Sequence, residues 1–518
     1  MKLIEYFKIT LLTFISPWLY GYYFDVIDHH HYLPYLNKIL NPDLYPNDYF
    51  FSQPHGLYSP FNNVIIFITR FFNLGFDWIY FFLYLISLWI LYYSVYLLAK
   101  TLYRQSGVAL LAVFFFIMPK WAAQIGYMTH QAYFVSRDLS LGISLLALAS
   151  LLGKKSLVSF FLIILAMFIN PSIPIPLVII WIVNRLPQIS RFLTFGFFDV
   201  MPDNSWLSIM RRRGTYSFPH LWTFKGWGNL VFYLSFIGIA KIILKRKFFG
   251  RYSLSIKRFL FICSILFIFH FIISAIYPIP SLIQLQLLRS LNFIFVIALI
   301  SMAAVVEVCL RHSHFLVRLA ALVALISLFS WGDHLTPYHI LAVWLLPVIY
   351  LFFPGHFSKP SQSKPIIGVI SGTLIVFLIY KLIIIKPQLS MPDFIYYPNA
   401  SINIDHYLTW HDVQTWAKLN TPIDAVFAVS PNSAGFRSFS ERGIIADTKD
   451  GGAVFYSPEY AQNCHARIRA LDNYQNFKEV DFIKLQERYY FDYLVVDKSQ
   501  ALSFELVYQN QDFLIYKM

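Results

Sequence analysis

The chain has 518 residues, of which 58% are hydrophobic and 13% are charged, and its mean hydropathy is +0.56. A soluble domain of this length does not carry so much apolar sequence, so the composition excludes a soluble protein and indicates a polytopic membrane protein. The formal net charge of +14 does not predict a nucleic-acid partner, because the basic residues collect in short loops between apolar segments.

Eleven apolar segments come close to the length of about 20 residues that a transmembrane helix needs. Several are short or interrupted by proline, and "FINPSIPIPLVIIWIVN" (168–184) predicts either a turn between two short spans or one kinked span. We therefore expect 11–13 transmembrane helices. The segments lie near residues 5–22, 76–99, 105–119, 139–152, 156–186, 229–244, 259–277, 290–310, 318–331, 339–353 and 366–385.

Basic residues set the predicted orientation, since Lys and Arg are retained on the cytoplasmic side of a membrane. The loop "KIILKRKFFGRYSLSIKR" (241–258) has seven basic residues and no acidic one, so we expect it in the cytoplasm. Counting spans from this loop places the N-terminus inside, in a first helix that is not cleaved, and everything after Lys386 outside.

The first outer loop, residues 23–75, opens with the titratable stretch "FDVIDHHHYLPYLNKIL". If a short helix runs over residues 24–38, Asp25, Asp28 and His29 lie on one face of it. One of the two carboxylates is then available as a general base beside the membrane. The alternative is a polar exit from the first helix, in which the aspartates only cap the next helix.

Asp48 ends the stretch "NPDLYPND", whose two prolines predict turns that bring this carboxylate back toward the membrane surface as a second acid. Together with Asp28 and His29 it also offers ligands for a divalent cation such as Mg²⁺ or Mn²⁺. Consecutive histidines on a helix do not converge on one ion, so we expect no certain cofactor and keep the metal as a weaker alternative.

Basic residues also occur in loops that the predicted orientation places outside, against the usual charge pattern. Such a set suits an anion, and arginine binds a lipid phosphate through two hydrogen bonds at once. For any single side chain, contact with lipid headgroups is the simpler interpretation. The residues concerned are Arg137, Arg211, Arg212, Arg213, His220 and Arg289.

The tail has a different pattern from the rest of the chain. A helix-period segment begins at "WHDVQTW", a short β run follows "NTPID", and "YYFDYLVVDKS" precedes the predicted hairpin "FELVYQNQDFLIYKM". The polar stretch "GFRSFSERG" (435–443) predicts a solvated loop. We therefore expect an all-α membrane domain over residues 1–386 and a small α/β extracytoplasmic domain over residues 387–518.

A multi-span chain, an acid-bearing loop directly after the first helix and an outer C-terminal domain together resemble the GT-C superfamily of membrane glycosyltransferases. More narrowly, "DHHHYLPYLNKILNPDLYPNDYF" and "FDYLVVDKS" are similar to sequences of poorly characterised bacterial multi-span proteins near that superfamily. The resemblance implies a sugar donor carried on a polyprenyl or dolichyl phosphate. It also implies a glycan, lipid or protein acceptor, contact with membrane lipid and residence in a bacterial inner membrane.

Carried over to this chain, the resemblance implies Asp28 or Asp25 as the catalytic acid of the first loop and Asp48 as the second acid. Arg289 best matches the phosphate-binding arginine, with Arg137 and residues 211–213 as further candidates. The implied reaction is an inverting displacement, in which Asp28 accepts the proton of an acceptor hydroxyl and the lipid phosphate leaves.

Two motifs of related enzymes are absent from the sequence: the Asp-Glu pair of protein O-mannosyltransferases and the Trp-Trp-Asp motif of oligosaccharyltransferases. Two alternatives to an enzyme therefore stay open. One is a non-catalytic subunit for assembly or polysaccharide export. The other is a secondary transporter, which is expected to carry charges near the bilayer midplane and to show repeated halves.

Overall fold

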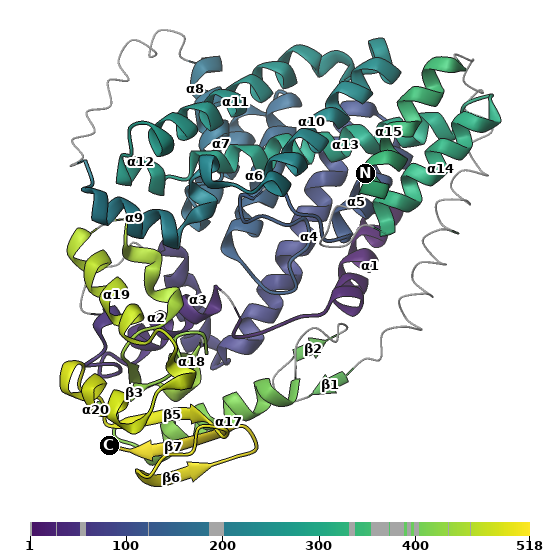
Figure 1. Cartoon of the computed structure of the whole chain (residues 1–518). Helices are drawn as coiled ribbons and strands as arrows, with labels where there is room; N and C mark the ends of the chain where they lie inside the picture. The colour runs from purple at the N-terminus through teal and green to yellow at the C-terminus, as the bar shows by residue number, and fades with distance from the viewer. Residues whose placement is uncertain are drawn as a thin grey trace. The chain divides into compact units, whose positions relative to one another are not determined.

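The chain divides into two compact units (Figure 1), which we call the helical unit and the mixed unit. The helical unit comprises residues 1–21, 82–200 and 214–387, and the mixed unit comprises residues 22–81, 201–213 and 388–518. The computed structural model describes residues 3–26, 28–51, 59–122, 124–185, 201–330, 337–353, 372, 388–390, 395–397, 404–433, 435–455 and 457–518.

The helical unit is built from apolar helices joined by short turns and 3₁₀ segments. The 3₁₀ segments are η3 (Thr215–Ser217), η4 (Pro219–Leu221), η5 (Lys245–Lys247), η6 (Gly250–Tyr252) and η7 (Leu287–Ser290). The helices are α1 (Leu3–Tyr20), α4 (Phe76–Tyr103, whose first turns belong to the mixed unit), α5 (Ser106–Ile117), α6 (Ser136–Leu152), α7 (Ser156–Ile169), α8 (Ile175–Arg185), α10 (Phe224–Leu244), α11 (Ser253–Ala275), α12 (Pro280–Gln284), α13 (Leu291–Leu310), α14 (Phe315–Ser330) and α15 (Pro337–Phe352).

The protein is an integral membrane protein, as its composition predicts. In the part of the chain that the structure describes, four helical stretches are long and apolar enough to cross a membrane: Phe76–Tyr103, Phe224–Leu244, Gly250–Ala275 and Pro280–Leu310. Four other predicted spans contain shorter apolar helices: Ser106–Ile117, Ser156–Ile169, Phe315–Phe329 and Pro337–Phe352. Except for residue 372, the predicted span at 366–385 lies outside the described residues, so the expected total of 11–13 stays a prediction.

The stretch "FINPSIPIPLVIIWIVN" is interrupted between two helices. Helix α7 ends at Ile169 and α8 begins at Ile175, with Asn170 as the extended residue that closes α7. Of the two predicted alternatives, the structure has the turn between two helices.

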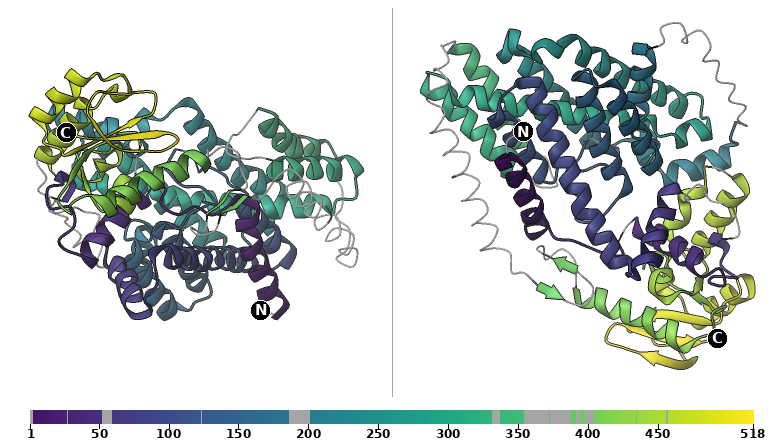
Figure 2. Two further views of the ribbon diagram at one scale, coloured as in Figure 1. Left: turned by 90° about the horizontal axis from the view of Figure 1, so that it is seen from below. Right: turned by 180° about the vertical axis from the view of Figure 1, so that it is seen from behind.

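Helix α13 lies in the core of the helical unit and packs against α5, α10, α11 and α14 (Figures 1 and 2). It is apolar on every side, which is typical of a helix that is surrounded by protein. Its one acid, Glu307, is buried and forms an ion pair with Arg311 four residues later, as the spacing predicts. A β-carbon on Gly107 of α5 lies only 3.2 Å from Glu307 Oε1, so glycine permits this close approach.

The mixed unit contains a five-stranded sheet with the strand order β4-β3-β5-β7-β6 (Figures 1 and 2). Strand β3 is parallel to β4 and β5, whereas β7 is antiparallel to β5 and β6. The strands are β3 (Val426–Ala428), β4 (Gly443–Ile444), β5 (Tyr493–Asp497), β6 (Glu505–Gln509) and β7 (Phe513–Lys517), and β1 (Gln388–Ser390) pairs with β2 (Ile395–Tyr397) in a separate ribbon.

Helices and one apolar cluster complete this α/β fold. Phe427, Val495 and Ile515 of the sheet pack with Val413 and Ala417 of α17 in a buried core. The predicted helix, strand and C-terminal hairpin of the tail are therefore confirmed. The helical elements of the mixed unit are α2 (His29–Leu40), η1 (Tyr49–Phe51), α3 (Pro60–Phe72), α9 (Asn204–Arg213), α17 (Ile404–Asn420), α18 (Phe436–Ser440), η9 (Thr448–Ala453), α19 (Pro458–Ala470), η10 (Tyr474–Asn476) and α20 (Glu479–Arg488).

The first outer loop lies in the mixed unit rather than with the membrane helices. The prediction assigned residues 23–75 to the domain of residues 1–386, but α2 packs against α18 and η9 of the tail. These contacts connect segments about 400 residues apart in the sequence, as the hydrogen bond from Asn37 to the carbonyl oxygen of Ser438 illustrates.

Candidate functional site

Helix α2 begins at His29, so the predicted helix over residues 24–38 is wrong at its start. Asp25 has a φ of 53°, which is left-handed backbone, and its N–H donates a hydrogen bond to His29 Nδ1 at 3.1 Å. This side-chain contact favours a turn over a helical start. Asp28 occupies the N-cap position of α2 without a side-chain cap hydrogen bond. Asp25 and Asp28 therefore do not share one helical face.

The backbone of Asp25 is fixed by the two histidines that follow. His29 is buried, and its ring lies edge-on against Tyr80 with the ring centroids 4.7 Å apart. His30 Nε2 donates to the carbonyl oxygen of Asp25 at 2.9 Å and lies 3.8 Å from the Oδ1 atom of its carboxyl group. The histidines thus position the aspartate instead of converging with it on one ion.

The carboxyl group of Asp25 is 4% exposed, and its Oδ1 atom accepts no hydrogen bond from the described residues. Burial raises the pKa of Asp25, and the neighbouring Asp447 adds to this effect, while His30, the hydroxyl group of Ser438 and His411 act against it. An unsatisfied buried oxygen, a raised pKa and a left-handed backbone are all costly, and such features concentrate at functional sites.

Gly435 lies directly against this group. Its φ is +88°, and a β-carbon there is only 2.6 Å from His30 Cδ2 and 3.3 Å from Asp25 Oδ2. Only glycine fits both the backbone conformation and the space.

Replacing Gly435 with alanine is therefore expected to lower the free energy of unfolding by about 2–4 kcal/mol. Gly126→Ala is the matched control, because Gly126 also has a positive φ but a β-carbon there meets nothing within 4 Å. It is expected to lose only the backbone contribution of about 1–2 kcal/mol. Pulse proteolysis in detergent measures both variants, and equal losses contradict the contact with His30.

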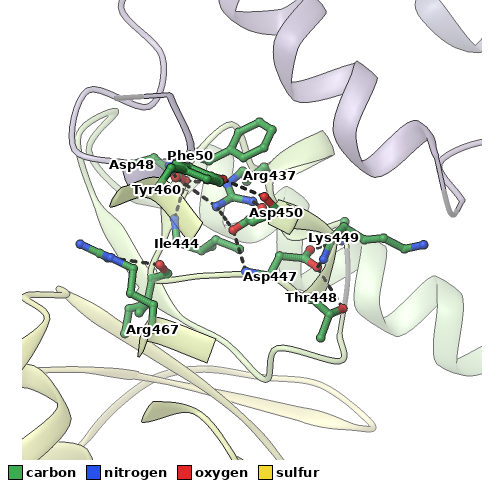
Figure 3. A network of polar contacts seen from close by, with 12 residues as sticks. Asp48, Phe50, Arg437, Ile444, Asp447, Thr448, Lys449, Asp450, Tyr460 and Arg467 are labelled. Carbon is green, nitrogen blue, oxygen red and sulfur yellow. Dashed lines mark hydrogen bonds and ion pairs between the residues drawn. The ribbon is translucent and has the colours of Figure 1, made fainter. Parts of the chain in front are cut away.

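Asp48 is buried and accepts four hydrogen bonds through its carboxylate (Figure 3). Arg437 donates from Nε at 2.6 Å and from Nη2 at 3.0 Å, and the backbone N–H groups of Phe50 and Ile444 donate at 2.9 Å each. These bonds fully engage the two carboxylate oxygens. The sequence predicts Asp48 as a second catalytic acid, but in the structure its carboxylate is bound to Arg437 and to two backbone N–H groups.

Arg437 is 4% exposed, so the prediction of a solvated loop at residues 435–443 is wrong. Its guanidinium group also donates to Asp450, from Nη1 at 2.7 Å and Nη2 at 3.0 Å, and lies 5.0 Å from the centre of the Phe50 ring. One arginine thus forms bidentate bonds with two carboxylates, a geometry that guanidinium groups favour.

A third carboxylate belongs to the same buried cluster. Asp447 and Asp450 form a capping box at η9, in which the N–H of Asp447 donates to Asp450 Oδ2 at 2.8 Å. Burial raises the pKa of Asp450 to about 6, although Arg437 opposes this shift. Burial and the neighbouring Asp447 and Asp48 therefore make the carboxyl group of Asp450 bind a proton more tightly in the folded chain than in the unfolded one.

The raised pKa of the Asp450 carboxyl group predicts that the stability of the protein depends on pH. The ordinary pKa of an aspartate in an unfolded chain is about 3.9. Because the pKa of Asp450 is raised in the folded state, the contribution of Asp450 to the free energy of unfolding is fully present below about pH 4 and is lost as the pH rises through about 6. Pulse proteolysis between pH 4 and 7 checks this, and Asp450→Asn is expected to flatten the decline. Parallel curves for the variant and the wild type contradict the assignment.

Two of the predicted anion-binding arginines line a cavity in the mixed unit. Arg212 and Arg213 end helix α9 and contribute to a cavity of about 580 Å³. Arg213 is fixed there, because its Nη1 atom donates to the carbonyl oxygen of Thr448 at 2.7 Å. Arg211, which precedes them, is half-buried and is not one of the residues that line this cavity.

The other predicted anion-binding residues belong to the helical unit. Arg289 lies in η7, directly before the long buried helix α13, and Arg137 lies in the first turn of α6 and donates to Gln131 Oε1 at 3.3 Å. His220 lies in η4 beside the ring of Phe218. The predicted acids and these three residues therefore belong to different units.

For a metal ion, the residues that the structure describes offer no group of three or more His, Cys, Asp or Glu side chains in a suitable arrangement. Asp48, one of the ligands in the predicted Asp28, His29 and Asp48 set, is engaged with Arg437. The observed contacts therefore do not favour the metal alternative.

Residues 409–471 match a family described as "Domain of unknown function (DUF6798)", and this range includes Gly435, Arg437, Asp447 and Asp450. No curated protein sequence matches the chain.

Among solved structures, the crystal structure of ArnT from Cupriavidus metallidurans in the apo state is similar, with 11% sequence identity and a TM-score of 0.40. The match covers 99% of this chain and 97% of that one.

Proposed function

We propose that this protein is a membrane glycosyltransferase of the GT-C type. It transfers a sugar from a polyprenyl-phosphate donor to a hydroxyl group of a glycan, lipid or protein acceptor. In this proposal the protein resides in a bacterial inner membrane, with the N-terminus in the cytoplasm and the mixed unit outside. The acids of the first outer loop then lie on the side where the lipid-linked sugar is used.

The observation that carries the proposal is the burial of the Asp25 carboxyl group and the pKa that this burial raises. The Oδ1 atom of this group accepts no hydrogen bond from the described residues. A base with a higher pKa accepts a proton more readily. Asp25 therefore suits the role of general base better than Asp48, whose carboxylate is fully bonded to Arg437 and backbone N–H groups.

The proposed reaction is a single inverting displacement. Asp25 Oδ1 accepts the proton of the acceptor hydroxyl as that oxygen forms a bond to the anomeric carbon of the sugar. The bond from that carbon to the phosphate oxygen breaks, and its electron pair leaves with the lipid phosphate. A cation is required to offset the charge that develops on the phosphate. Asp28 at the N-cap of α2 is the second candidate for the base.

One observation favours a different function. Asp48 of the first outer loop and Arg437 of the tail form a buried ion pair. This contact gives an acid of the loop a structural role that needs no catalysis. A non-catalytic assembly subunit requires this contact and no base. A transfer assay with a labelled polyprenyl-phosphate sugar separates the two functions, because Asp25→Asn stops transfer in an enzyme and leaves an assembly function intact.

A further inference from the structure

The mixed unit has a polar cavity of about 580 Å³ that the proposed reaction does not use. This volume is within the range of small-molecule sites and is larger than a lone phosphate ion requires. The cavity is lined by Arg212, Arg213, Pro431, Asn432, Thr448, Ile468, Leu471, Asp472, Asn473 and Gln475.

Helix α9 is fixed to η9, so its two arginines have a defined place at this cavity. Trp206 Nε1 donates to the carbonyl oxygen of Val454 at 2.6 Å, and Arg213 donates to that of Thr448. The aliphatic part of Arg213 lies against Gly451, where a β-carbon is 3.1 Å from Arg213 Cδ. The side chain of Arg213 is thereby held, while Arg212 is exposed at the cavity.

The charge around the cavity is positive. Arg212 and Arg213 supply two positive charges to its lining. Asp472 is the one carboxylate that lines the cavity. An anionic group is therefore favoured over a cation or a neutral ligand.

The remaining polar residues suit a hydroxyl-rich ligand. Asn432, Asn473 and Gln475 supply amide donors and acceptors, and Thr448 supplies a hydroxyl group. Amide side chains bond sugar hydroxyls through both atoms of the amide, whereas arginine bonds phosphate or carboxylate. We propose that this cavity binds an anionic saccharide, with Arg212 and Arg213 on its phosphate or carboxylate and the amides on its hydroxyls.

The segment at η9 contributes both to the cavity, through Thr448, and to the buried cluster of Asp48, Arg437, Asp447 and Asp450. Asp447 and Asp450 bond within the cluster around Arg437, and the hydroxyl group of Thr448 donates to Asp447 Oδ1 at 3.4 Å (Figure 3). A saccharide in the cavity is thus bound beside the segment that borders Asp25. This inference rests on the proposed function, and it assigns the cavity to the saccharide part of the donor lipid or of the acceptor.

Direct binding to the full chain in nanodiscs of phosphatidylcholine tests the inference. Labelled glucose 1-phosphate is the probe, with inorganic phosphate and glucose as competitors. The expected result is saturable binding that glucose 1-phosphate displaces better than either competitor. Arg212→Ala and Asn473→Ala are each expected to weaken binding by about tenfold or more, because each removes a ligand contact. Arg488→Ala is the control, since Arg488 is exposed and does not line the cavity.

Nanodiscs that contain phosphatidylglycerol identify the source of the anion. Displacement of the probe by this lipid overturns the inference, because the cavity then binds a phospholipid headgroup and not a saccharide, whereas no displacement supports the inference. Displacement by an added polyprenyl-phosphate sugar assigns the saccharide to the donor, and no displacement by it assigns the saccharide to the acceptor. Equal binding by the wild type and both cavity variants overturns the inference, as does a preference for inorganic phosphate. Asp25→Asn is expected to bind the probe normally, so a failure of transfer and a failure of this site are distinguishable.

Discussion

Replacing Arg437 with methionine is expected to lower the free energy of unfolding of the mixed unit by about 3–5 kcal/mol. The guanidinium group makes bidentate bonds to both Asp48 and Asp450, and all three side chains are buried. Methionine fills a similar volume but leaves two carboxylates in an apolar setting without their counter-charge. Pulse proteolysis of the full chain in detergent measures the loss.

Two comparisons show whether the loss comes from the unpaired acids. Arg488→Met changes an exposed arginine of α20 and is expected to stay within about 0.5 kcal/mol of the wild type. The triple variant with Asp48→Asn and Asp450→Asn added to Arg437→Met removes the uncompensated charges, so it is expected to be more stable than the single variant. A single variant as stable as Arg488→Met contradicts the role of Arg437.

Asp25→Asn is expected to lower the rate of sugar transfer by about 10²–10⁴-fold. The amide has nearly the shape of the carboxyl group but does not accept a proton in the reaction, so binding and folding are expected to change little. Asp43→Asn is the matched control, because Asp43 is an exposed acid of the same loop. Transfer by this control is expected at the wild-type rate.

Local patterns predicted the parts of the fold that depend on neighbouring residues. The period-2 alternation of "FELVYQNQDFLIYKM" predicts a hairpin, and β6 and β7 pair antiparallel as expected. The helix of the tail and the ion pair between Glu307 and Arg311 likewise depend on spacings of a few residues. Hydropathy predicted that the chain is a membrane protein, because this prediction depends only on composition and not on contacts between distant residues.

The contacts that form the site are not local, and the sequence did not predict them. Arg437 is 389 residues away from Asp48, so nothing in "GFRSFSERG" distinguishes a buried arginine from a solvated one. The signals that were present are Gly435 before the arginine and the acid pair Asp447 and Asp450 after it. Both are ordinary features of polar loops, and they acquire a role only when the first outer loop packs against them.

The prediction for the first loop placed a helical start where the structure has a turn. Helical spacing placed Asp25 and Asp28 on one face, because the three histidines and the leucines that follow favour a helix. The hydrogen bond from Asp25 N–H to His29 Nδ1 stabilises a turn instead, and the helix begins four residues after Asp25. A side-chain contact of this kind outweighs a pattern of spacing.

The most direct test of the central claim is the pH dependence of sugar transfer in proteoliposomes, with a labelled polyprenyl-phosphate sugar as donor. Wild type, Asp25→Asn, Asp28→Asn and Asp43→Asn are compared at equal amounts of inserted protein. If Asp25 is the base, wild-type transfer rises with pH through a pKa above the ordinary aspartate range, and only Asp25→Asn loses both the activity and this dependence. If Asp25→Asn transfers sugar at the wild-type rate with the same pH profile, Asp25 is not the catalytic base.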